Sequence, residues 1–580
     1  MSDHSIRARP PAGGVPAPPR ISTDPDVLAA FLEDAAHFPG GFASGICTPS
    51  SEAGVAALVR AASTVLPIGA QSSLTGGATP RGEVILSTSR LNRILASGDD
   101  WIRVDAGVTL VDLDLALARL GKLYPPVPTF AGAFVGGIVA TNAAGAATFK
   151  YGTTRDWVRA LTVVLPNGDV LGIERGQTRA HLDGFFEIVL SDRTVRVSVP
   201  RYTMPNVPKV SAGYFAAPGM DLIDLFIGSE GTLGVITEVT LRVLPSRPAM
   251  CLAFVPFGDR RAALAFVTRL REAARETWRT GDPRGMDVSA IEHMDARCLA
   301  LLREDGADRA NRVTIPDGTA MALLVTLELP SGTRGSAEVR RLEGLRHEES
   351  ASPDVRRPEG LRHDESRTPH TADPRPYTAE RAFDDIGRAL GADAPDTPLG
   401  RFCRALDEAG VLDRVEIAVP GDAARAHQLL ALREAVPEGV NARVGRAKQA
   451  DARIAKTAAD MIVPFERVGE LLAIYDAEFR ARGLDAAVWG HISDGNLHPN
   501  VIPRSMDEVE SGKAAILAFG REVIRLGGSP LAEHGVGRNP VKQQLLLDLY
   551  GQEGVEDMRA VKRALDPDFK LAPGVLFGER

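Results

Sequence analysis

Cysteine is scarce in this sequence, and an excess of positive charge is lacking. The 580 residues include only Cys47, Cys251, Cys298 and Cys403, which are too widely spaced for a zinc ribbon, an iron–sulfur cluster or a disulfide framework. This cysteine usage predicts a reducing, cytoplasmic location. The 67 Lys and Arg residues are outnumbered by 75 Asp and Glu, for a formal net charge of −8. The charge therefore speaks against nucleic acid or an acidic membrane surface as the partner.

Long apolar runs are lacking as well. No stretch approaches the roughly 18 apolar residues of a membrane-spanning helix, so we expect no transmembrane segment and at most peripheral membrane contact. Residues 1–41 contain no signal-peptide core, and the first 21 are rich in Pro, Gly and Arg, which predicts a disordered lead-in. Hydrophobic residues make up 44% and charged residues 24%, an ordinary globular balance, and the length predicts at least two domains.

Local patterns predict a first domain over residues 42–244 and a second, cap or substrate domain over residues 245–465. In the first, residues 84–86, 101–104, 161–165 and 235–243 have strand patterns, and residues 53–62 and 110–120 have the three- and four-residue apolar spacing of helices. In the second, we expect a helix over 262–274 and a buried strand over 320–328. Residues 466–580 form the C-terminal segment, which we expect to close the active site.

The second domain contains a segment of different composition, residues 331–378. Residues 340–350 (RRLEGLRHEES) are nearly repeated as residues 356–366 (RRPEGLRHDES). A polar, proline-broken duplication cannot bury a core of its own, so we expect a low-complexity insert. Its His347 and His363 could bind metal, but the composition favours a solvated surface.

Glycine is concentrated in three segments of the first half, residues 67–77, 136–145 and 227–236. Glycine allows backbone N–H groups to approach a phosphate closely, and Ser72, Ser73 and Thr75 add hydroxyl donors. Neither G-x-G-x-x-G nor a Walker A motif occurs, which disfavours a standard nicotinamide or P-loop site. One such segment is more often a turn, but three in this order are much harder to dismiss as turns.

The string at residues 489–499 (WGHISDGNLHP) contains two histidines around a turn signal. Asp494-Gly495 is typical of a two-residue hairpin loop, and this register places His491 directly opposite His498. Opposed residues share a face with Cβ atoms about 4.5–5.5 Å apart, which suits two imidazoles binding one metal ion.

A carboxylate and a histidine follow at Glu533-His534, in residues 531–537 (LAEHGVG). They could supply a third metal ligand and a proton acceptor. Neighbours on a regular strand point to opposite faces, so the pair needs an irregular backbone, which Gly535 and Gly537 make plausible. A surface turn with ion pairs is the alternative.

Together, the three glycine segments, G-H-x-x-D-G-N-x-H at residues 490–498 and E-H-G-x-G at residues 533–537 resemble a known family. It is the vanillyl-alcohol oxidase / p-cresol methylhydroxylase superfamily, in its D-lactate, D-2-hydroxyglutarate and glycolate dehydrogenase branch. The resemblance covers about residues 42–577 without the insert. It implies an α+β fold: a two-lobed FAD-binding domain of the p-cresol methylhydroxylase type, an α+β cap with an antiparallel sheet flanked by helices, and a helical C-terminal return.

The resemblance also implies the cofactors and their residues. FAD would be non-covalent, because residues 67–77 contain no His or Cys. The residues implied to bind it are Pro67, Ile68, Gly69, Ala70, Gln71, Ser72, Leu74, Thr75, Gly76, Gly77, Gly136, Gly137, Thr141, Asn142, Gly145, Tyr151, Gly152, Glu230, Gly231, Gly234, Val235, Ile236 and Asn496. A divalent ion, zinc or manganese, would be bound by His491, His498 and Glu533.

For catalysis the resemblance implies His534 as the base and Arg433 and Lys456 as partners of a substrate carboxylate. The sequence departs from the family at three places. Some relatives have the lysine two residues nearer Pro464 than Lys456, where this chain has Ala458. Lys542 lies further from Gly537 than the corresponding lysine does in relatives, and Ala572-Pro573-Gly574 stands where the family often has Asn-Pro-Gly. These departures affect details of substrate and flavin contact.

The implied activity is oxidation of a D-2-hydroxy acid, with D-lactate as first choice, to the 2-oxo acid by hydride transfer to flavin N5. An unidentified electron acceptor is the second partner, and a homodimer stays open. Two alternatives remain. One is a non-redox flavoenzyme like alkylglycerone-phosphate synthase, and the other is a non-catalytic flavin-binding protein. Bleaching of flavin by a substrate separates the first function from both.

Overall fold

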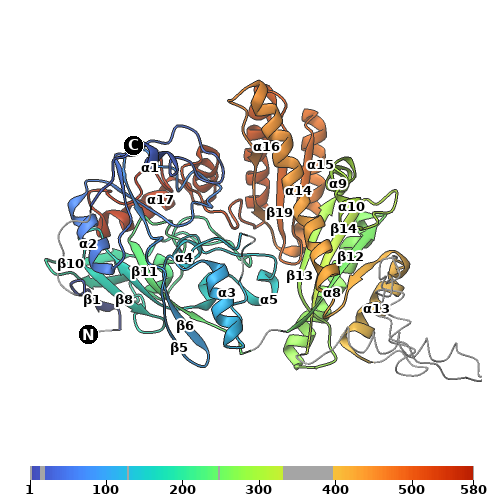
Figure 1. Ribbon diagram of the computed structural model, residues 1–580, viewed down its shortest axis with the longest axis horizontal. Helices are drawn as coiled ribbons and strands as arrows, with labels where there is room; N and C mark the ends of the chain where they lie inside the picture. The colour runs from blue at the N-terminus through green and yellow to red at the C-terminus, as the bar shows by residue number, and fades with distance from the viewer. Residues whose placement is uncertain are drawn as a thin grey trace, which may run out of the picture. The chain divides into compact units, whose positions relative to one another are not determined.

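The computed structural model describes residues 3–12, 20–126, 128, 130–245, 248–330 and 396–578. The chain divides into two compact units, of which the first comprises Met1–Arg247 with Arg443–Arg580 and the second Pro248–Ala442 (Figure 1). The second unit therefore begins close to the predicted residue 245 but ends before the predicted residue 465. Its end lies inside helix α14 (Ala423–Ala450), so no linker or change of composition marks it. The duplicated insert, residues 331–378, lies outside the described residues.

The N-terminal part of the first unit contains three sheets. Its strands are β1 (Ser5–Arg7), β2 (Gly45–Cys47), β3 (Val65–Ile68), β4 (Val84–Ser87), β5 (Ile94–Ser97), β6 (Trp101–Asp105), β7 (Val158–Val164), β8 (Val170–Glu174), β9 (Phe185–Val189), β10 (Thr194–Ser198) and β11 (Val235–Arg242). The sheet β2–β4–β3 is parallel, the five-stranded sheet β5–β6–β11–β7–β8 is antiparallel, and β1–β9–β10 forms the third. The four strands predicted here are confirmed.

Short helices connect these strands. They are α1 (Pro25–Ala29), α2 (Glu52–Ala61), α3 (Leu110–Arg119), α4 (Val135–Ala140), α5 (Thr148–Tyr151), α6 (Thr154–Trp157) and α7 (Ile223–Phe226). The two predicted helices, α2 and α3, begin where a hydroxyl side chain caps the first turn: Ser51 accepts from Gly54 N, and Thr109 accepts from Asp112 N.

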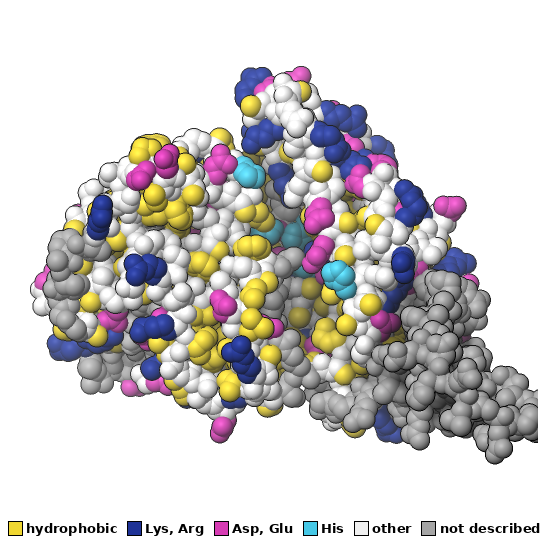
Figure 2. All heavy atoms as spheres, viewed as in Figure 1, with side chains coloured by type: hydrophobic (Ala, Val, Ile, Leu, Met, Phe, Trp, Pro, Cys, Tyr) yellow, Lys and Arg dark blue, Asp and Glu magenta, His cyan; other side chains and the backbone are white. Residues whose placement is uncertain are grey.

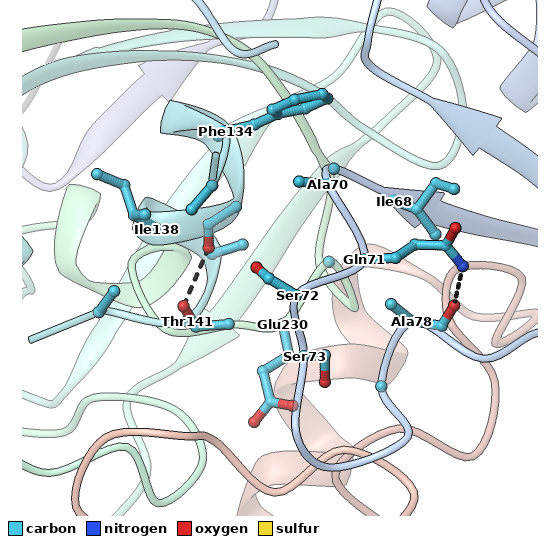
Figure 3. A pocket seen from close by; sticks show the side chains of 18 of the residues that line it. Ile68, Ala70, Gln71, Ser72, Ser73, Ala78, Phe134, Ile138, Thr141 and Glu230 are labelled. Atoms are coloured by element: carbon cyan, nitrogen blue, oxygen red, sulfur yellow. Dashed lines mark hydrogen bonds between the residues drawn. The ribbon is translucent and has the colours of Figure 1, made fainter. Parts of the chain in front are cut away.

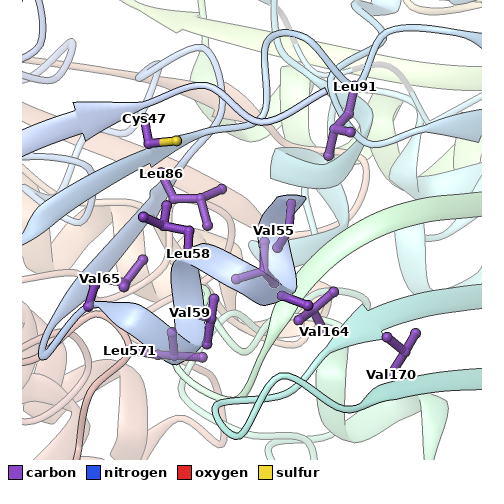
Figure 4. Packing of buried hydrophobic residues seen from close by; sticks show 13 residues of the cluster. Cys47, Val55, Leu58, Val59, Val65, Leu86, Leu91, Val164, Val170 and Leu571 are labelled. Carbon is purple, nitrogen blue, oxygen red and sulfur yellow. The ribbon is translucent and has the colours of Figure 1, made fainter. Parts of the chain in front are cut away.

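One hydrophobic core contains residues of the N-terminal part of the chain together with a residue near the C-terminus. Val55, Leu58 and Val59 of α2 are fully buried and pack with residues of β3, β4, β7 and β8 and with Leu571 near the C-terminus (Figure 4). Backbone hydrogen bonds continue this contact, because Ala572 N donates to Val65 O at 2.8 Å. The C-terminal segment is therefore part of the N-terminal lobe.

The expectation of a disordered lead-in is wrong for its described residues. Strand β1 pairs in parallel with β9, and the backbone of Arg9 exchanges two hydrogen bonds with Val170, at 2.8 and 2.9 Å. The guanidinium of Arg9 also binds the carboxylate of Glu52. Composition could not reveal this order, because free edges of sheets formed by later residues supply the partners.

The C-terminal part of the first unit combines a small sheet with three long helices. Its elements are β16 (Thr457–Ala458), β17 (Met461–Ile462), η2 (Phe465–Arg467), α15 (Val468–Arg482), β18 (Ala486–His491), β19 (Asn496–Val501), α16 (Met506–Arg525) and α17 (Pro540–Leu565). Strand β19 pairs antiparallel with β18, β16 and β17, and α16 packs against both α15 and α17. The predicted helical return is confirmed.

The second unit is an antiparallel sheet with helices packed on it, as predicted for the cap. Strands β15 (Glu416–Ala418), β12 (Ala249–Phe257), β14 (Met321–Leu329) and β13 (Asp287–Asp295) are neighbours in that order. The described helices are α8 (Arg260–Thr280), α9 (Ala296–Glu304), α10 (Ala307–Ala310), α13 (Pro398–Glu408), η1 (Leu412–Arg414) and the first part of α14, of which α8 and α9 pack on β13 and β14.

The surface carries charges of both signs. On the face shown in Figure 2, basic and acidic side chains are interspersed, in keeping with the small net charge. Within the described residues, no helix combines the length and the apolar character required to cross a membrane.

Candidate active site

A cavity of about 310 Å³ lies in the first unit, where the three glycine-rich segments meet. Figure 3 shows α4 with Phe134 and Ile138 on one side and the segment bearing Ile68, Ala70 and Gln71 on the other. Seventeen of the residues predicted to bind FAD line the cavity: Pro67, Ile68, Gly69, Ala70, Gln71, Ser72, Leu74, Thr75, Gly77, Gly136, Gly137, Thr141, Glu230, Gly231, Gly234, Val235 and Ile236. Six do not: Gly76, Asn142, Gly145, Tyr151, Gly152 and Asn496.

Sequence reasoning missed part of the lining. Besides Ser73, which the sequence already offered as a hydroxyl donor, the lining includes Ala78, Thr88, Pro128, Phe130, Ala133, Phe134, Ile138, Ala140, Ala143 and Ala144. Ala78 directly follows the first glycine segment, and the last four of these residues lie inside the second, so their position was the available signal. The stretch from Pro128 to Phe134 carries no motif, so nothing local pointed to it.

Each glycine segment holds one non-glycine residue in the left-handed region: Gln71 has φ 52°, Asn142 φ 49° and Glu230 φ 52°. Such a backbone costs about 1–3 kcal/mol per residue and persists only where the surroundings hold it. The Gln71 amide donates to Phe31 O at 3.0 Å and Ala78 O at 2.9 Å. These bonds fix the curve of the first segment around the cavity.

The second and third segments are also tied to each other. Gly228 N donates to Val139 O at 3.0 Å, and Glu230 N donates to Ala140 O at 2.8 Å, so the third segment lies against the end of α4. The cavity wall is therefore one connected backbone framework.

The glycines of α4 show why small residues are required there. A Cβ on Gly136 would lie 2.7 Å from the Cβ of Ala106, so the helix packs too closely for a side chain. A Cβ on Gly137 would meet no atom within 4 Å, and Gly137 lines the cavity. The cavity thus keeps open room beside exposed backbone, with hydroxyls at Ser72 and Thr75, and these features fit an elongated phosphate-bearing cofactor such as FAD.

The hairpin that carries the two histidines has a different register from the predicted one. His491 pairs with Asn496 and Trp489 with His498, so the expectation that His491 directly faces His498 is wrong. The loop has four residues rather than two, because Asp494 N donates to His491 O and Gly495 N to Ile492 O, each at 3.2 Å. A shift of two positions keeps every side chain on its original face. The two histidines therefore remain neighbours as a diagonal pair, with ring centroids 5.4 Å apart.

Glu533 completes a buried group of three possible metal ligands. His491 Nε2 lies 3.5 Å from Glu533 Oε1, and His498 Nε2 lies 3.8 Å from Glu533 Oε2. All three ligand atoms lie within 4.8 Å of one another. Two imidazoles and a carboxylate are a donor set that zinc and similar divalent ions accept, so these residues fit a divalent metal. The alternative of a surface turn is wrong, because Glu533 is buried.

Lys209 is a residue of this site that sequence reasoning missed. Its fully buried ammonium contacts Glu533 and lies 2.9 Å from Asp494 Oδ2. Burial alone would lower the pKa of Lys209, but the two carboxylates raise it above its usual value. Burial also raises the pKa of Asp494 to about 6. Lys209 follows no recognisable motif, so only the tertiary structure identifies it.

Asp460 is a second missed residue and holds the segment of the predicted base. Its Oδ1 accepts from Ala532 N at 2.8 Å and Glu533 N at 2.6 Å, and its Oδ2 lies 2.7 Å from His534 Nδ1 and 3.0 Å from Lys542 Nζ. Burial raises the pKa of Asp460, but Lys542 and His534 together hold it well below the usual range.

The base segment, residues 531–537 with the predicted base His534, has an irregular backbone, as predicted. Gly535 has φ 74° and Gly537 φ 58°, both in the left-handed region. Because of this backbone, the side chain of Glu533 lies beside His491 and His498 while the neighbouring His534 lies at the cavity. Glu533, His534 and His491 all line the cavity. The side chain of His534 is 30% exposed, so a small molecule can reach it.

Glu230, in the third glycine segment at the cavity, is bonded to the base segment. Its two carboxylate oxygens accept from Val536 N and Gly537 N, each at 2.8 Å. Burial raises the pKa of Glu230 to about 7, against the lowering effect of those N–H groups. Next to it, Arg538 N donates to Thr75 O at 3.0 Å. The base segment is therefore bonded to the third and the first glycine segments at once.

Three other predicted residues have different surroundings. Asn496 donates to Met461 O at 3.0 Å, and its side-chain oxygen lies 2.9 Å from His498 Nε2, so it contacts a histidine of the candidate metal group rather than lining the cavity. The ammonium of Lys456 lies 5.9 Å from the ring centroid of Trp489. Arg433 belongs to the second unit, where its Nε contacts Glu292. Substrate binding by Lys456 and Arg433 stays a prediction.

Comparison with known proteins agrees with a cavity that binds FAD. The family model of an FAD binding domain matches residues 43–174, and the model of the C-terminal domain of FAD linked oxidases matches residues 395–576. A D-lactate dehydrogenase of Anaerostipes hadrus is 25% identical over 96% of this chain and 94% of its own length. A D-2-hydroxyglutarate dehydrogenase of Xanthomonas citri pv. viticola is 26% identical over 96% and 94%.

Two further similarities cover most of the chain. The glycolate oxidase subunit GlcD of Bacillus subtilis is 26% identical over 89% of this chain and 84% of its own length. Among solved structures, an alkyldihydroxyacetonephosphate synthase superposes with a TM-score of 0.53 at 13% identity, covering 98% of this chain and 89% of that one. At that identity the superposition shows the shared fold alone.

Proposed function

Because this chain belongs to the FAD-linked oxidoreductases of the vanillyl-alcohol oxidase / p-cresol methylhydroxylase superfamily, we propose that it oxidises a D-2-hydroxy acid to the 2-oxo acid, with D-lactate the first choice. One observation carries the proposal: His534, His491 and Glu533 line the same cavity as the three glycine segments. The proposed base, two of the proposed metal ligands and the segments proposed to bind FAD therefore line the same cavity.

The cavity residues would hold FAD, and His491, His498 and Glu533 would hold a divalent metal, zinc or manganese. FAD supplies a hydride acceptor for the substrate α-carbon, and the metal supplies a Lewis acid for its hydroxyl and carboxylate oxygens. Metal binding is supported by the buried two-histidine and carboxylate donor set.

This chain's own residues move the proton and orient the substrate. His534 accepts the proton of the substrate hydroxyl as a general base, and its Nδ1 contact with Asp460 directs its Nε2 away from that carboxylate. Arg433 and Lys456 are the cations we assign to the substrate carboxylate, since a guanidinium matches a carboxylate with two parallel hydrogen bonds. An external electron acceptor completes the cycle.

The fold similarity to an alkyldihydroxyacetonephosphate synthase leaves one alternative function open, that of a flavoenzyme without net redox chemistry. The complete His491, His498 and Glu533 set favours the dehydrogenase, because a buried ligand set of this kind has no use in a metal-free site. A non-catalytic flavin-binding protein would likewise have no need of the base and its buried partner.

The test is an anaerobic titration of purified, metal-loaded holoprotein with a panel of D- and L-2-hydroxy acids, following the oxidised flavin absorbance. We expect one D-acid to bleach the flavin rapidly, and His534→Ala to lose this response while retaining FAD. His37→Ala, at an exposed histidine on the same unit, serves as the matched control and should bleach normally. If no hydroxy acid bleaches the wild-type flavin, the dehydrogenase proposal is overturned, and an alkyl-exchange assay then separates the two rivals.

A further inference from the structure

One buried carboxylate, Asp460, contacts both the predicted base and the backbone of a metal-type ligand. It is 0% exposed, and both of its oxygens are used: Oδ1 for the N–H groups of Ala532 and Glu533, Oδ2 for His534 Nδ1. A side chain from the short link between β16 and β17, more than 70 residues earlier in the chain, thus holds the irregular segment in place.

We propose that Asp460 is a positioning residue that fixes His534 in one tautomer and one orientation, with Nε2 left as the proton acceptor. This inference rests on the proposed function, because it assigns His534 as the base. Asp460 acts on the reaction through His534 and need not contact the substrate.

The chemistry of the contact decides the tautomer. An ionised carboxylate accepts hydrogen bonds and cannot donate one, so the ring nitrogen 2.7 Å away must carry the hydrogen. In a neutral imidazole the other nitrogen, Nε2, then carries a lone pair and no hydrogen. The same contact limits rotation of the ring, so the lone pair keeps a constant direction.

Lys542 keeps Asp460 in the ionised form that this function needs. Its ammonium lies 3.0 Å from Asp460 Oδ2 and 3.2 Å from Gly535 O, at the first turn of α17. A lone buried carboxylate would be costly, and the paired ammonium offsets that cost. The carboxylate is therefore held between Lys542 and His534 as a hydrogen-bond acceptor.

The sharpest variant is Asp460→Asn, which keeps the size of the side chain. Its oxygen can still accept from the backbone of Ala532 and Glu533, while its amide N–H₂ faces His534 Nδ1. That nitrogen must then become the acceptor, which places the hydrogen on Nε2 and removes the base. The ammonium of Lys542 loses its acceptor on this side chain and keeps Gly535 O. We expect kcat to fall on the order of 10²- to 10⁴-fold, with KM nearly unchanged and FAD and metal contents retained.

Asp169→Asn is the matched control in the same unit. Asp169 is also buried and accepts hydrogen bonds from Ser191 N and from the Asn167 amide, both at 2.8 Å, but it does not line the cavity. It should leave kcat unchanged. The double variant Asp460→Asn with His534→Ala should be no slower than His534→Ala alone, because both remove one function. Additive losses would mean that Asp460 is merely structural and would overturn the proposal.

A spectroscopic readout separates this proposal from the proposed function. In substrate-free holoprotein at about pH 8, where an ordinary histidine is neutral, ¹⁵N shifts should show the hydrogen of His534 on Nδ1 in the wild type and on Nε2 in Asp460→Asn. A hydrogen on Nε2 in the wild type overturns the proposal even if the variant cannot be purified. A correct tautomer in a protein whose flavin no hydroxy acid bleaches would reject the dehydrogenase function and leave the Asp460–His534 contact standing.

Discussion

Gly537 lies where the base segment meets the first glycine segment, and Gly537→Ala should loosen both. The residue has φ 58°, and a Cβ would lie 2.3 Å from Thr75 Oγ1 and 2.4 Å from Thr75 O. The second contact is with backbone, which cannot move aside as a flexible side chain would. The first glycine segment must therefore shift.

Two costs set the magnitude. A left-handed alanine costs roughly 1–2 kcal/mol. Thr75 O also accepts from Arg538 N at 3.0 Å, and displacing it leaves a buried acceptor unsatisfied, at roughly 1–3 kcal/mol. We expect a total loss of about 2–5 kcal/mol in unfolding free energy, together with weaker FAD binding because Thr75 lines the cavity.

The assay is urea unfolding of the holoprotein with a parallel measurement of the FAD dissociation constant. Gly121→Ala is the control, because Gly121 has φ 68° and no atom within 4 Å of its Cβ position. It should show only the conformational cost, about 1–2 kcal/mol, and unchanged FAD affinity. Equal effects of the two variants on unfolding and on FAD binding would refute the reasoning.

Three further predictions follow from single contacts. Ala572→Gly should leave the urea midpoint nearly unchanged. Relief of the left-handed alanine at φ 43° is offset by the added unfolded-state entropy of glycine and by loss of a buried methyl group, worth about 0.8 kcal/mol; a clearly raised or lowered midpoint would contradict this balance. Burial raises the pKa of Glu230 in the folded protein to about 7, from 4.5. Its contribution to stability is therefore complete below pH 4.5 and is lost as pH rises through 7. Glu230→Gln should flatten this part of the curve of apoprotein stability against pH, and a curve identical to that of the wild type would contradict this role of Glu230. Glu533→Gln should lower bound metal by more than about tenfold on elemental analysis while FAD content stays the same, and equal metal content would remove Glu533 from the ligand set.

The local patterns of the sequence were sufficient for much of the fold. Strands β4, β6, β7 and β11 and helices α2 and α3 follow from alternation, helical spacing and hydroxyl caps, which act within a few residues. The grouping of glycine with hydroxyl residues identified the segments that line the cavity. The hairpin register was off by two, because a four-residue loop fits the Asp494-Gly495 signal as well as a two-residue loop does.

The sequence by itself determined which chemical groups are present near the site: two histidines around a turn, a glutamate beside a histidine, and three glycine-rich segments. Only the tertiary structure decided what surrounds them. Lys209 reaches Glu533 across 324 positions, Glu230 reaches Val536 across 306, and Asp460 reaches Glu533 across 73. Periodicity and turn chemistry extend over one or two turns of chain, whereas these contacts depend on how whole sheets and helices pack, so no local pattern could specify them.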